Sequence, residues 1–439
     1  GDQISIGGVD MELVPITKRQ EQLQSQLRTR GSGPISSIFG LILLTLLQAA
    51  MLMGFLLSGV EEEYPSYVLG FCSVAICQWG LFLFYAVIHR SSFEVETLAF
   101  FLCTLGMAAI ATVKPGEILK QAAAMVLGVL TFLLIGWSLR DLERAKRCRY
   151  LAVLLGVGFL VITLLFGREY YGAKNWLVIG GLSLQPSELS KVCFVYAGAS
   201  TMDRIMNKRN LILFIAYSVV ICGLLALMND FGTAMIFFCA FLIIAYLRSG
   251  SVGTIALACT ALGFAGVLAI RIAPHALNRF ATWRHIWENP YSSGYQQTQA
   301  IMCIASGGLF GLGAGKGFLQ KVFAADSDIV FATISEEWGL LLALLAVLVV
   351  ATLGFFAIRT SRVSRSSFYC IGGCTAAGIL LIQAALNCLG TVDVLPFTGV
   401  TFPFLSNGGT SMIGAWGLLA FVKAADTRQN ASFAVRYTK

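Results

Sequence analysis

Four acidic side chains lie close together in a chain that is otherwise poor in charge. Residues 324–339 read AADSDIVFATISEEWG, whereas only 12% of all 439 residues are charged. The carboxylates are Asp326, Asp328, Glu336 and Glu337, and the apolar run LLLALLAVLVVATLGFF follows them directly. Burial beside such a run raises the proton affinity of a carboxylate toward neutrality. These side chains are therefore candidates for proton transfer, and for Asp328 the alternative is that it only caps the start of a helix.

A second group of candidates lies earlier in the chain, in the stretch GAKNWLVIGGLSLQPSELSK. Lys174 and Trp176 open this stretch, and Pro186 marks the first turn of a helix whose N-terminus would be a natural anion site. Glu188 and Lys191 are three residues apart and share one face of that helix. Ionisable groups inside a membrane usually pair and mark function. We therefore expect either a buried Glu188–Lys191 pair or a role for Lys191 in gripping the phosphates of a ligand.

Two further polar stretches complete the set of candidates. Asp230 in NDFGTA is either an N-cap or part of an active-site wall. The stretch FPFLSNGGTS precedes the last apolar run, and irregular backbone at membrane depth is tolerated only where protein or a watery cavity lines it. It is either a cavity wall, with Ser406, Asn407 and Thr410 as hydrogen-bond donors, or a simple turn that begins a helix. Lys321, in a long loop, is a further candidate substrate contact.

Membrane-spanning helices must position these candidates. The chain is 57% hydrophobic, with a mean hydropathy of +0.78, and runs of about 17 to 25 apolar residues are long enough to cross a bilayer. The sequence therefore predicts an all-α polytopic membrane protein with about 12 transmembrane helices. The predicted spans are 37–59, 67–88, 95–113, 119–139, 149–166, 187–201, 210–228, 231–247, 251–272, 335–358, 367–390 and 409–425.

The distribution of Lys and Arg orients the chain in the membrane. With a cytoplasmic N-terminal tail, most cations fall in inside segments such as RDLERAKRCRY and RTSRVSR, and the even number of spans makes the C-terminus cytoplasmic too. The large loop 273–332 and the candidate carboxylates are then extracytoplasmic. The net charge of +8 reflects this topology and contact with anionic lipid headgroups, and we expect no nucleic-acid partner.

The N-terminal tail, residues 1–34, differs from the rest of the chain. The stretch GDQISIGGVDMELVPI alternates apolar and polar residues, which predicts a strand pair. It resembles the last strands of a forkhead-associated domain, a phosphothreonine reader, and this would make the chain a truncated piece of a larger protein. A flexible cytoplasmic tail is the alternative.

Four motifs, which occur in one order, carry a more specific resemblance. They are GAKNWLVIGGLSLQPSELSK, NDFGTA, SGYQQTQAIMCIASGGLFGLGAGKGFLQKVFAADSDIVFATISEEWG and LPFTGVTFPFLSNGGTS. Together they resemble the SEDS family (shape, elongation, division and sporulation), whose members include RodA and FtsW. The family usually has three spans before its Q-P-S-E motif, whereas five precede it here. The resemblance covers roughly residues 95–425 and implies a SEDS core at 95–439, with two extra transmembrane helices at 35–94.

The resemblance implies an inverting peptidoglycan glycosyltransferase of the bacterial cytoplasmic (plasma) membrane. Such an enzyme polymerises lipid II, an undecaprenyl-diphosphate-linked disaccharide peptide, into β-1,4 glycan on the outer face, with a class B penicillin-binding protein as its transpeptidase partner. A sugar hydroxyl needs a positioned base, and the resemblance assigns this role to Asp328. Asp326 stands where the family often has His, and we expect its charge to raise the proton affinity of Asp328. We interpret Glu336 and Glu337 as structural groups that can bond the first-turn amides of their own helix.

A lipid II flippase built on the same cavity is the main alternative function. A transporter needs sites reachable from both sides, whereas the inner loops of this chain are basic and lack clustered carboxylates. The sequence shows no dedicated metal cage and assigns no definite cofactor. Diphosphate groups often bind Mg²⁺ or Mn²⁺, so either ion is a candidate cofactor.

Overall fold

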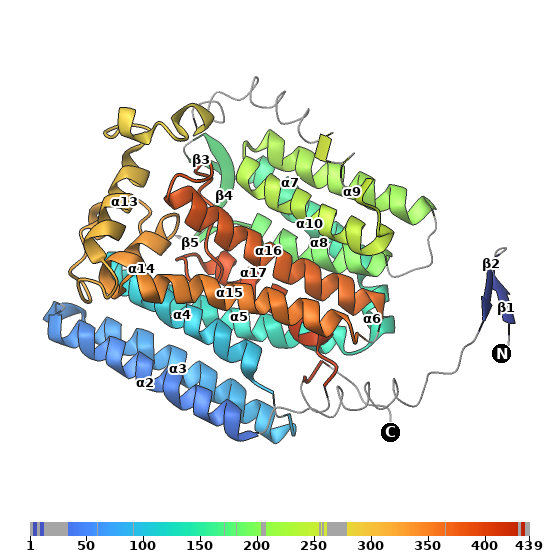
Figure 1. Ribbon diagram of the computed structural model, residues 1–439, viewed down its shortest axis with the longest axis horizontal. Helices are drawn as coiled ribbons and strands as arrows, with labels where there is room; N and C mark the ends of the chain where they lie inside the picture. Colours follow the sequence, from blue (N-terminus) through green and yellow to red (C-terminus); the bar gives the residue numbers. More distant parts are fainter. Residues whose placement is uncertain are drawn as a thin grey trace.

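The structure is a computed structural model whose regular elements are helices apart from two short sheets (Figure 1). Strands β1 (Gln3–Ile6) and β2 (Val9–Glu12) form an antiparallel pair, which confirms the strand pair predicted in the N-terminal tail. The forkhead-associated assignment stays a prediction, because residues 13–33 lie outside the described residues. The structure describes residues 3–6, 9–12, 34–58, 60–90, 92–170, 172–180, 182–202, 208–253, 256, 259–260, 279–364, 366–428 and 432–434.

The prediction of an all-α polytopic membrane protein is confirmed. Two short helices, α8 (Ser187–Met202) and α17 (Gly409–Ala425), occupy two of the predicted spans. The predicted span at 251–272 lies largely outside the described residues. Nine described helices are long and apolar enough to cross a membrane: α2 (Pro34–Ser58), α3 (Tyr64–Val87), α4 (Glu94–Val113), α5 (Ile118–Leu139), α7 (Arg149–Phe166), α9 (Lys208–Leu227), α10 (Phe231–Ser249), α15 (Leu340–Ser361) and α16 (Ser367–Thr391).

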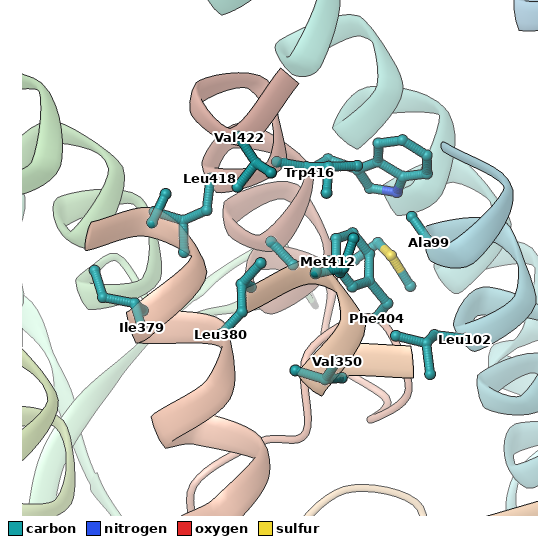
Figure 2. Close-up of a cluster of buried hydrophobic side chains, with 14 of the residues drawn as sticks. Ala99, Leu102, Val350, Ile379, Leu380, Phe404, Met412, Trp416, Leu418 and Val422 are labelled. Atoms are coloured by element: carbon teal, nitrogen blue, oxygen red, sulfur yellow. The ribbon is translucent and has the colours of Figure 1, made fainter. Parts of the chain in front are cut away.

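Helix α17 lies at the centre of the bundle. It is mostly apolar and almost entirely buried, and such a helix is stable when other helices surround it. The ring of Trp416 is fully buried, with its centroid 5.0 Å from that of Phe100 and 5.6 Å from that of Phe132. Gly128 of α5 makes room for the indole, because a Cβ there would lie 2.6 Å from it. Figure 2 shows this helix between side chains of α4 and α16, with Met412, Leu418, Ala99, Leu102, Ile379 and Leu380 among those drawn.

The segments that carry the candidate residues gather at one end of the bundle (Figure 1). This end holds α13 (Tyr295–Gly307), α14 (Val330–Trp338) and a three-stranded sheet, whereas α6 (Leu142–Arg147) lies at the opposite end. In the sheet, β4 (Ala173–Ile179) pairs antiparallel with both of its neighbours. The outer strands are β3 (Arg168–Tyr170) and β5 (Leu182–Leu184).

The predicted span at 335–358 is wrong at its start, because two helices occupy this region. Helix α14 ends at Trp338, Gly339 adopts a φ of +89°, and only then does α15 begin. The glycine-rich loop 307–317 packs against the end of α14, where Leu312 N donates to Glu336 O at 2.9 Å. A Cβ on Gly339 would collide with the backbone of this loop. The break therefore lets α14 stay buried inside the protein while α15 continues as the span.

The N-terminal helices α2 and α3 pack against the rest of the bundle through polar contacts. Gln48 of α2 donates to Gln78 of α3 at 3.0 Å and to Thr104 of α4 at 3.1 Å, and all three side chains are buried. At the other end of α2, Ser58 donates to Ala314 O in the glycine-rich loop at 2.6 Å. The helix pair is therefore fixed along its length to the part of the chain that carries the candidate site.

A buried ion pair joins three helices at the end of α4 farthest from α14. Lys423 Nζ lies 3.0 Å from Glu96 Oε2, and both side chains are fully buried. Tyr85 of α3 donates to the other carboxylate oxygen of Glu96 at 2.6 Å, and Lys423 also donates to Ser92 O at 2.9 Å. Paired charges in a low-dielectric interior depend on each other for solvation, so this cluster locks α3, α4 and α17 together.

Candidate active site

The two aspartates of the DSD sequence have different surroundings. Asp326 is 1% exposed, and its carboxylate lies 3.1 Å from Lys114 Nζ and accepts a 2.7 Å hydrogen bond from Asn407 Nδ2. Asp328 is partly buried and has no ion pair among the described residues. Asp326 is therefore committed to a structural ion pair, whereas the Asp328 carboxylate is available for chemistry.

Burial raises the pKa of the Asp328 carboxyl to about 6. The residue is half-buried, and loss of water around the carboxyl disfavours its charged form. The neighbouring Ser327 side chain and the positive charge of Arg279 partly offset this rise, and the charge of Asp326 adds to it. The predicted influence of Asp326 is thus present in the expected direction, but burial is the main cause of the raised pKa.

Side chains from distant parts of the chain hold the backbone around Asp328. Asn387 Nδ2, on α16, donates to Asp328 O at 2.9 Å and to Val400 O at 2.8 Å. Ser406 Oγ donates to Ser327 O at 2.6 Å. These bonds tie the aspartate segment to α16 and to the loop that follows it, so the position of the carboxylate is set by tertiary contacts.

A glycine forms the wall beside the Asp328 carboxylate. Gly399 adopts a φ of +67°, and a Cβ at this position would lie 3.3 Å from Asp328 Oδ2. Glycine adopts such a backbone conformation without steric cost. Because Gly399 has no side chain, the Asp328 carboxylate can lie close to the loop.

The three predicted donors of the FPFLSNGGTS stretch have partners inside the protein. Ser406 is 2% exposed and holds Ser327, as described above. Asn407 Nδ2 donates to Glu117 Oε2 and to Asp326 Oδ2, both at 2.7 Å. Thr410 is 4% exposed, and its hydroxyl accepts a 3.0 Å hydrogen bond from the backbone N–H of residue 185. The structure gives these side chains a role in building the wall of the site.

The start of α10 forms a second wall that meets the same loop. Asp230 caps this helix, because its Oδ1 accepts from Thr233 N at 3.2 Å, and its Oδ2 accepts from Asn175 Nδ2 at 3.3 Å. A Cβ on Gly232 would lie 3.2 Å from side-chain atoms of both Thr398 and Val400. Asp230 is therefore both an N-cap and a neighbour of the loop that contacts Asp328.

Lys174 and Trp176 lie on β4, next to this wall. Both side chains are partly exposed, and Lys174 N donates to Met228 O at 2.9 Å, which joins the strand to the end of α9. Successive residues of a strand point to opposite faces. Lys174 and Trp176 therefore share the face of β4 opposite to Asn175, which contacts Asp230.

The other predicted cations of the site lie in different surroundings. Lys191 Nζ is 2.7 Å from Glu188 Oε2, and both side chains are buried on α8, so the predicted pair is present. Lys321 is exposed, and its ammonium lies 5.3 Å from the ring centroid of Phe318. Lys191 is thus engaged within its own helix, whereas Lys321 remains accessible at the surface.

The expected contacts of Glu336 and Glu337 with the first turn of their own helix are wrong. Both residues lie in the last turn of α14 and accept hydrogen bonds from the glycine-rich loop and its continuation. Glu336 accepts from Phe318 N at 2.9 Å and from Leu319 N at 3.0 Å. Glu337 accepts from Gly317 N at 3.2 Å and from the Thr112 hydroxyl at 2.6 Å. These carboxylates hold the loop, which explains the four acids in this stretch as one available base and three structural groups.

Sequence reasoning missed three polar side chains of the site. Lys114 ends α4 and pairs with Asp326, Asn387 lies within the apolar α16, and Arg279 Nη1 donates to Thr398 O at 3.1 Å. The Lys in the short turn TVKPGE and the Asn within an apolar helix are unusual for their surroundings and were available signals. Their partners could not be read from the sequence, because Lys114 and Asp326 are 212 residues apart.

The described part of the chain contains no group of three or more His, Cys, Asp or Glu side chains that could hold a metal ion. The carboxylates nearest to Asp328 already have donors, because Asn407 bridges Glu117 and Asp326. These residues therefore do not form a protein cage for Mg²⁺ or Mn²⁺.

Comparison with known proteins gives concordant matches. The sequence model of the FtsW, RodA and SpoVE family, described as cell cycle protein, matches residues 73–431. The chain is 30% identical over 326 residues to the peptidoglycan glycosyltransferase RodA of Mycobacterium tuberculosis, which covers 69% of each chain. It is 30% identical over 396 residues to a probable peptidoglycan glycosyltransferase FtsW of Bacillus subtilis, which covers 83% of this chain and 92% of that protein.

Solved structures share the fold. A structure of a peptidoglycan synthase complex that coordinates polymerization and crosslinking contains a chain with a TM-score of 0.64 and 24% identity, covering 75% of this chain and 96% of that one. The crystal structure of Thermus thermophilus RodA gives a TM-score of 0.55 and 23% identity, and the match covers 75% of this chain and 95% of that one. With the family match over most of its length, the chain belongs to the FtsW, RodA and SpoVE family of cell cycle proteins, the SEDS family that its motifs resemble.

Proposed function

We propose that this protein is an inverting peptidoglycan glycosyltransferase that polymerises lipid II into β-1,4 glycan, with Asp328 as the general base. The observation that carries the proposal is the contrast between the two aspartates. Asp326 is neutralised by Lys114, whereas Asp328 lacks an ion pair among the described residues and has a pKa of about 6. Such a carboxyl group is ionised near neutral pH and still has a high enough affinity to accept a proton.

The reaction needs only one carboxylate of this kind. The C4 hydroxyl of one sugar attacks the anomeric carbon of a lipid-linked chain, Asp328 takes the hydroxyl proton, and the lipid diphosphate leaves with the bonding electrons. Because diphosphate is a good leaving group, no second carboxyl is needed to protonate it, unlike glycoside hydrolysis. Cations near the diphosphate would stabilise its growing negative charge.

The family and the apolar helices support a multi-pass membrane protein. We propose that it lies in the bacterial cytoplasmic membrane with both termini in the cytoplasm and the Asp328 end of the bundle outside. A class B penicillin-binding protein is the proposed partner, in keeping with the related chain found in a peptidoglycan synthase complex. Any Mg²⁺ or Mn²⁺ would be carried by the diphosphate of the substrate.

A flippase is less well supported by the arrangement of charges. Carboxylates do lie at the end of the bundle opposite to Asp328, which the sequence did not predict. Arg428 lies 2.8 Å from Glu94 and 2.9 Å from Asp426, and Glu96 pairs with Lys423. Each of these acids has a cationic partner, with Arg428 shared by two of them, whereas Asp328 has no such partner, so among the described residues the two ends do not present matching sites for a transported headgroup.

The proposal is tested with the purified protein in lipid nanodiscs and lipid II as substrate, with and without the partner transpeptidase. We expect glycan polymers, separated by gel electrophoresis, in at least the sample with the partner. If lipid II instead crosses the bilayer of proteoliposomes without forming polymer in either sample, the protein is a flippase and the proposal is wrong.

The pH dependence of polymerisation should show the titration of Asp328. Because the base acts only when ionised and burial raises its pKa to about 6, the rate should fall below pH 6, by about tenfold for each further pH unit. Initial rates measured between about pH 5 and about pH 8 test this expectation. A limb centred near the ordinary pKa of an aspartate would contradict the assignment of this carboxyl group as the base.

Replacing Lys174 by Ala should weaken use of the lipid-linked donor by roughly 10-fold or more, if its ammonium contacts phosphate. The side chain is partly exposed on β4, beside the Asp230 wall. Kinetics with varied lipid II concentration measure the effect, and Lys316→Ala, an exposed lysine of the glycine-rich loop, is the matched control. Equal kinetics in the two variants would make Lys174 a structural residue.

A further inference from the structure

Three hydrogen bonds fix the segment 279–284 to the loop after α16. Arg279 Nη1 donates to Thr398 O at 3.1 Å and Trp283 Nε1 to Val394 O at 3.2 Å. The backbone N–H of Arg284 donates to Asp393 Oδ1 at 3.1 Å. The last two bonds do not involve the Arg279 side chain, so the segment would keep its place if that side chain were shortened.

This attachment brings Arg279 close to the proposed base. The guanidinium binds the carbonyl of Thr398, and the next residue, Gly399, lies against Asp328 Oδ2. Arg279 and Asp328 therefore contact two adjacent residues of one loop, Thr398 and Gly399. The positive charge of Arg279 lowers the pKa of Asp328, as expected for two groups at short range.

Arg279 also differs from the other cations near the site. Lys114 is held by Asp326, and Lys191 is buried against Glu188. Arg279 is exposed, and among the described residues its guanidinium makes one hydrogen bond, to a neutral carbonyl, with no carboxylate partner. A guanidinium retains several N–H donors in a planar fork that fits two phosphate oxygens at once.

We propose that Arg279 forms, with the loop at Thr398 and Gly399, a binding site for the diphosphate of the lipid-linked sugar donor. The site lies on the loop that also contacts Asp328, within reach of a substrate that spans the two, and the inference rests on the proposed function. Binding there stabilises the negative charge that develops as the glycosidic bond to diphosphate breaks. It also orients the anomeric carbon toward the base.

Binding can be measured without turnover in the full chain carrying Asp328→Asn, embedded in nanodiscs. The probes are undecaprenyl diphosphate and undecaprenol, which share the lipid tail and differ in charge. Adding Arg279→Gln should weaken binding of the diphosphate by about 10-fold or more, with undecaprenol unaffected. Arg279→Lys should lie between the two, because it keeps the charge and loses the fork.

The matched control is Arg284→Gln in the same background. Arg284 belongs to the same exposed segment, but its guanidinium lies 5.2 Å from the ring centroid of Trp283. This variant should bind the diphosphate normally. Equal diphosphate binding with and without Arg279 would overturn the inference, as would an equal loss in both arginine variants.

A second readout separates this role from a purely structural one. In the otherwise wild-type enzyme, Arg279→Gln removes a charge that lowers the pKa of Asp328, so the acid limb of the rate profile should move to higher pH. Arg284→Gln should leave the limb in place, and an unshifted limb in Arg279→Gln would count against the inference. If the wild-type protein binds the diphosphate through Arg279 but makes no polymer, the proposed function fails while the binding site stands.

Discussion

Replacing Asp328 by Asn should lower the rate of lipid II polymerisation by about 10²- to 10⁴-fold, the usual cost of losing a general base. Asparagine has nearly the same shape and keeps a carbonyl acceptor, but it cannot take a proton. The hydrogen bonds that hold this segment, from Asn387 and Ser406, go to backbone carbonyls and survive the change. We therefore expect the variant to fold, enter the membrane and bind its partner while making no measurable polymer.

The neighbouring aspartate provides the control. Asp326→Asn removes the ion pair with Lys114, whose side chain is 46% exposed, and retains an acceptor for Asn407. Asp326 takes no part in the proposed proton transfer, so this variant should lose far less activity than Asp328→Asn, although its melting temperature should fall because the Asp326 side chain is buried. Polymer yield and melting temperature, measured on both proteins, give the comparison. Full activity in Asp328→Asn, or failure of that protein alone to fold, would end the catalytic interpretation.

Replacing Lys423 by Met should strongly destabilise the protein. The change leaves Glu96 fully buried without its cation, and breaking such a buried pair typically costs about 3–5 kcal/mol. The effect should appear as a large fall in melting temperature of the purified protein in detergent, far from the Asp328 end of the bundle. Polymerisation by the fraction that remains folded should change little.

A double variant distinguishes charge burial from loss of packing. Glu96→Gln together with Lys423→Met removes both charges, so most of the lost stability should return. Tyr85→Phe is a milder comparison, because it removes only the 2.6 Å hydrogen bond to Glu96. If Lys423→Met melts at the wild-type temperature, or if the double variant is less stable than the single one, the pair does not stabilise the bundle as we describe.

The membrane-spanning helices were largely predictable, because a helix that crosses a bilayer needs a long run of apolar residues. The break at Gly339 was not, because a hydropathy average taken over the long apolar run that follows does not register one glycine with a positive φ. For the same reason the buried helix α14 could not be distinguished from the start of a span. The glycine-rich loop can be recognised in the sequence by its composition, but the sequence does not show that it packs against the end of α14.

The candidate site was predictable in its residue types and only partly in its roles. Two aspartates in one tripeptide cannot be ranked by type, and their difference arises from Lys114, which lies 212 residues from Asp326 in sequence. Similarly, Ser406 and Thr410 were recognised as polar groups at a helix start, but their internal partners come from other segments. What the sequence could not supply in each case was the identity of the contacting segment.

The wall around Asp328 has a consequence for drug resistance. An inhibitor that filled the space beside the carboxylate would contact Gly399, the carbonyl of Thr398 and the backbone held by Asn387. Main-chain atoms are present whatever the side chain, and a larger residue at Gly399 would be strained by its φ of +67° and crowded by Asp328 Oδ2 at 3.3 Å. Few single substitutions could therefore exclude such a compound and still leave a working enzyme, so escape from it should arise slowly.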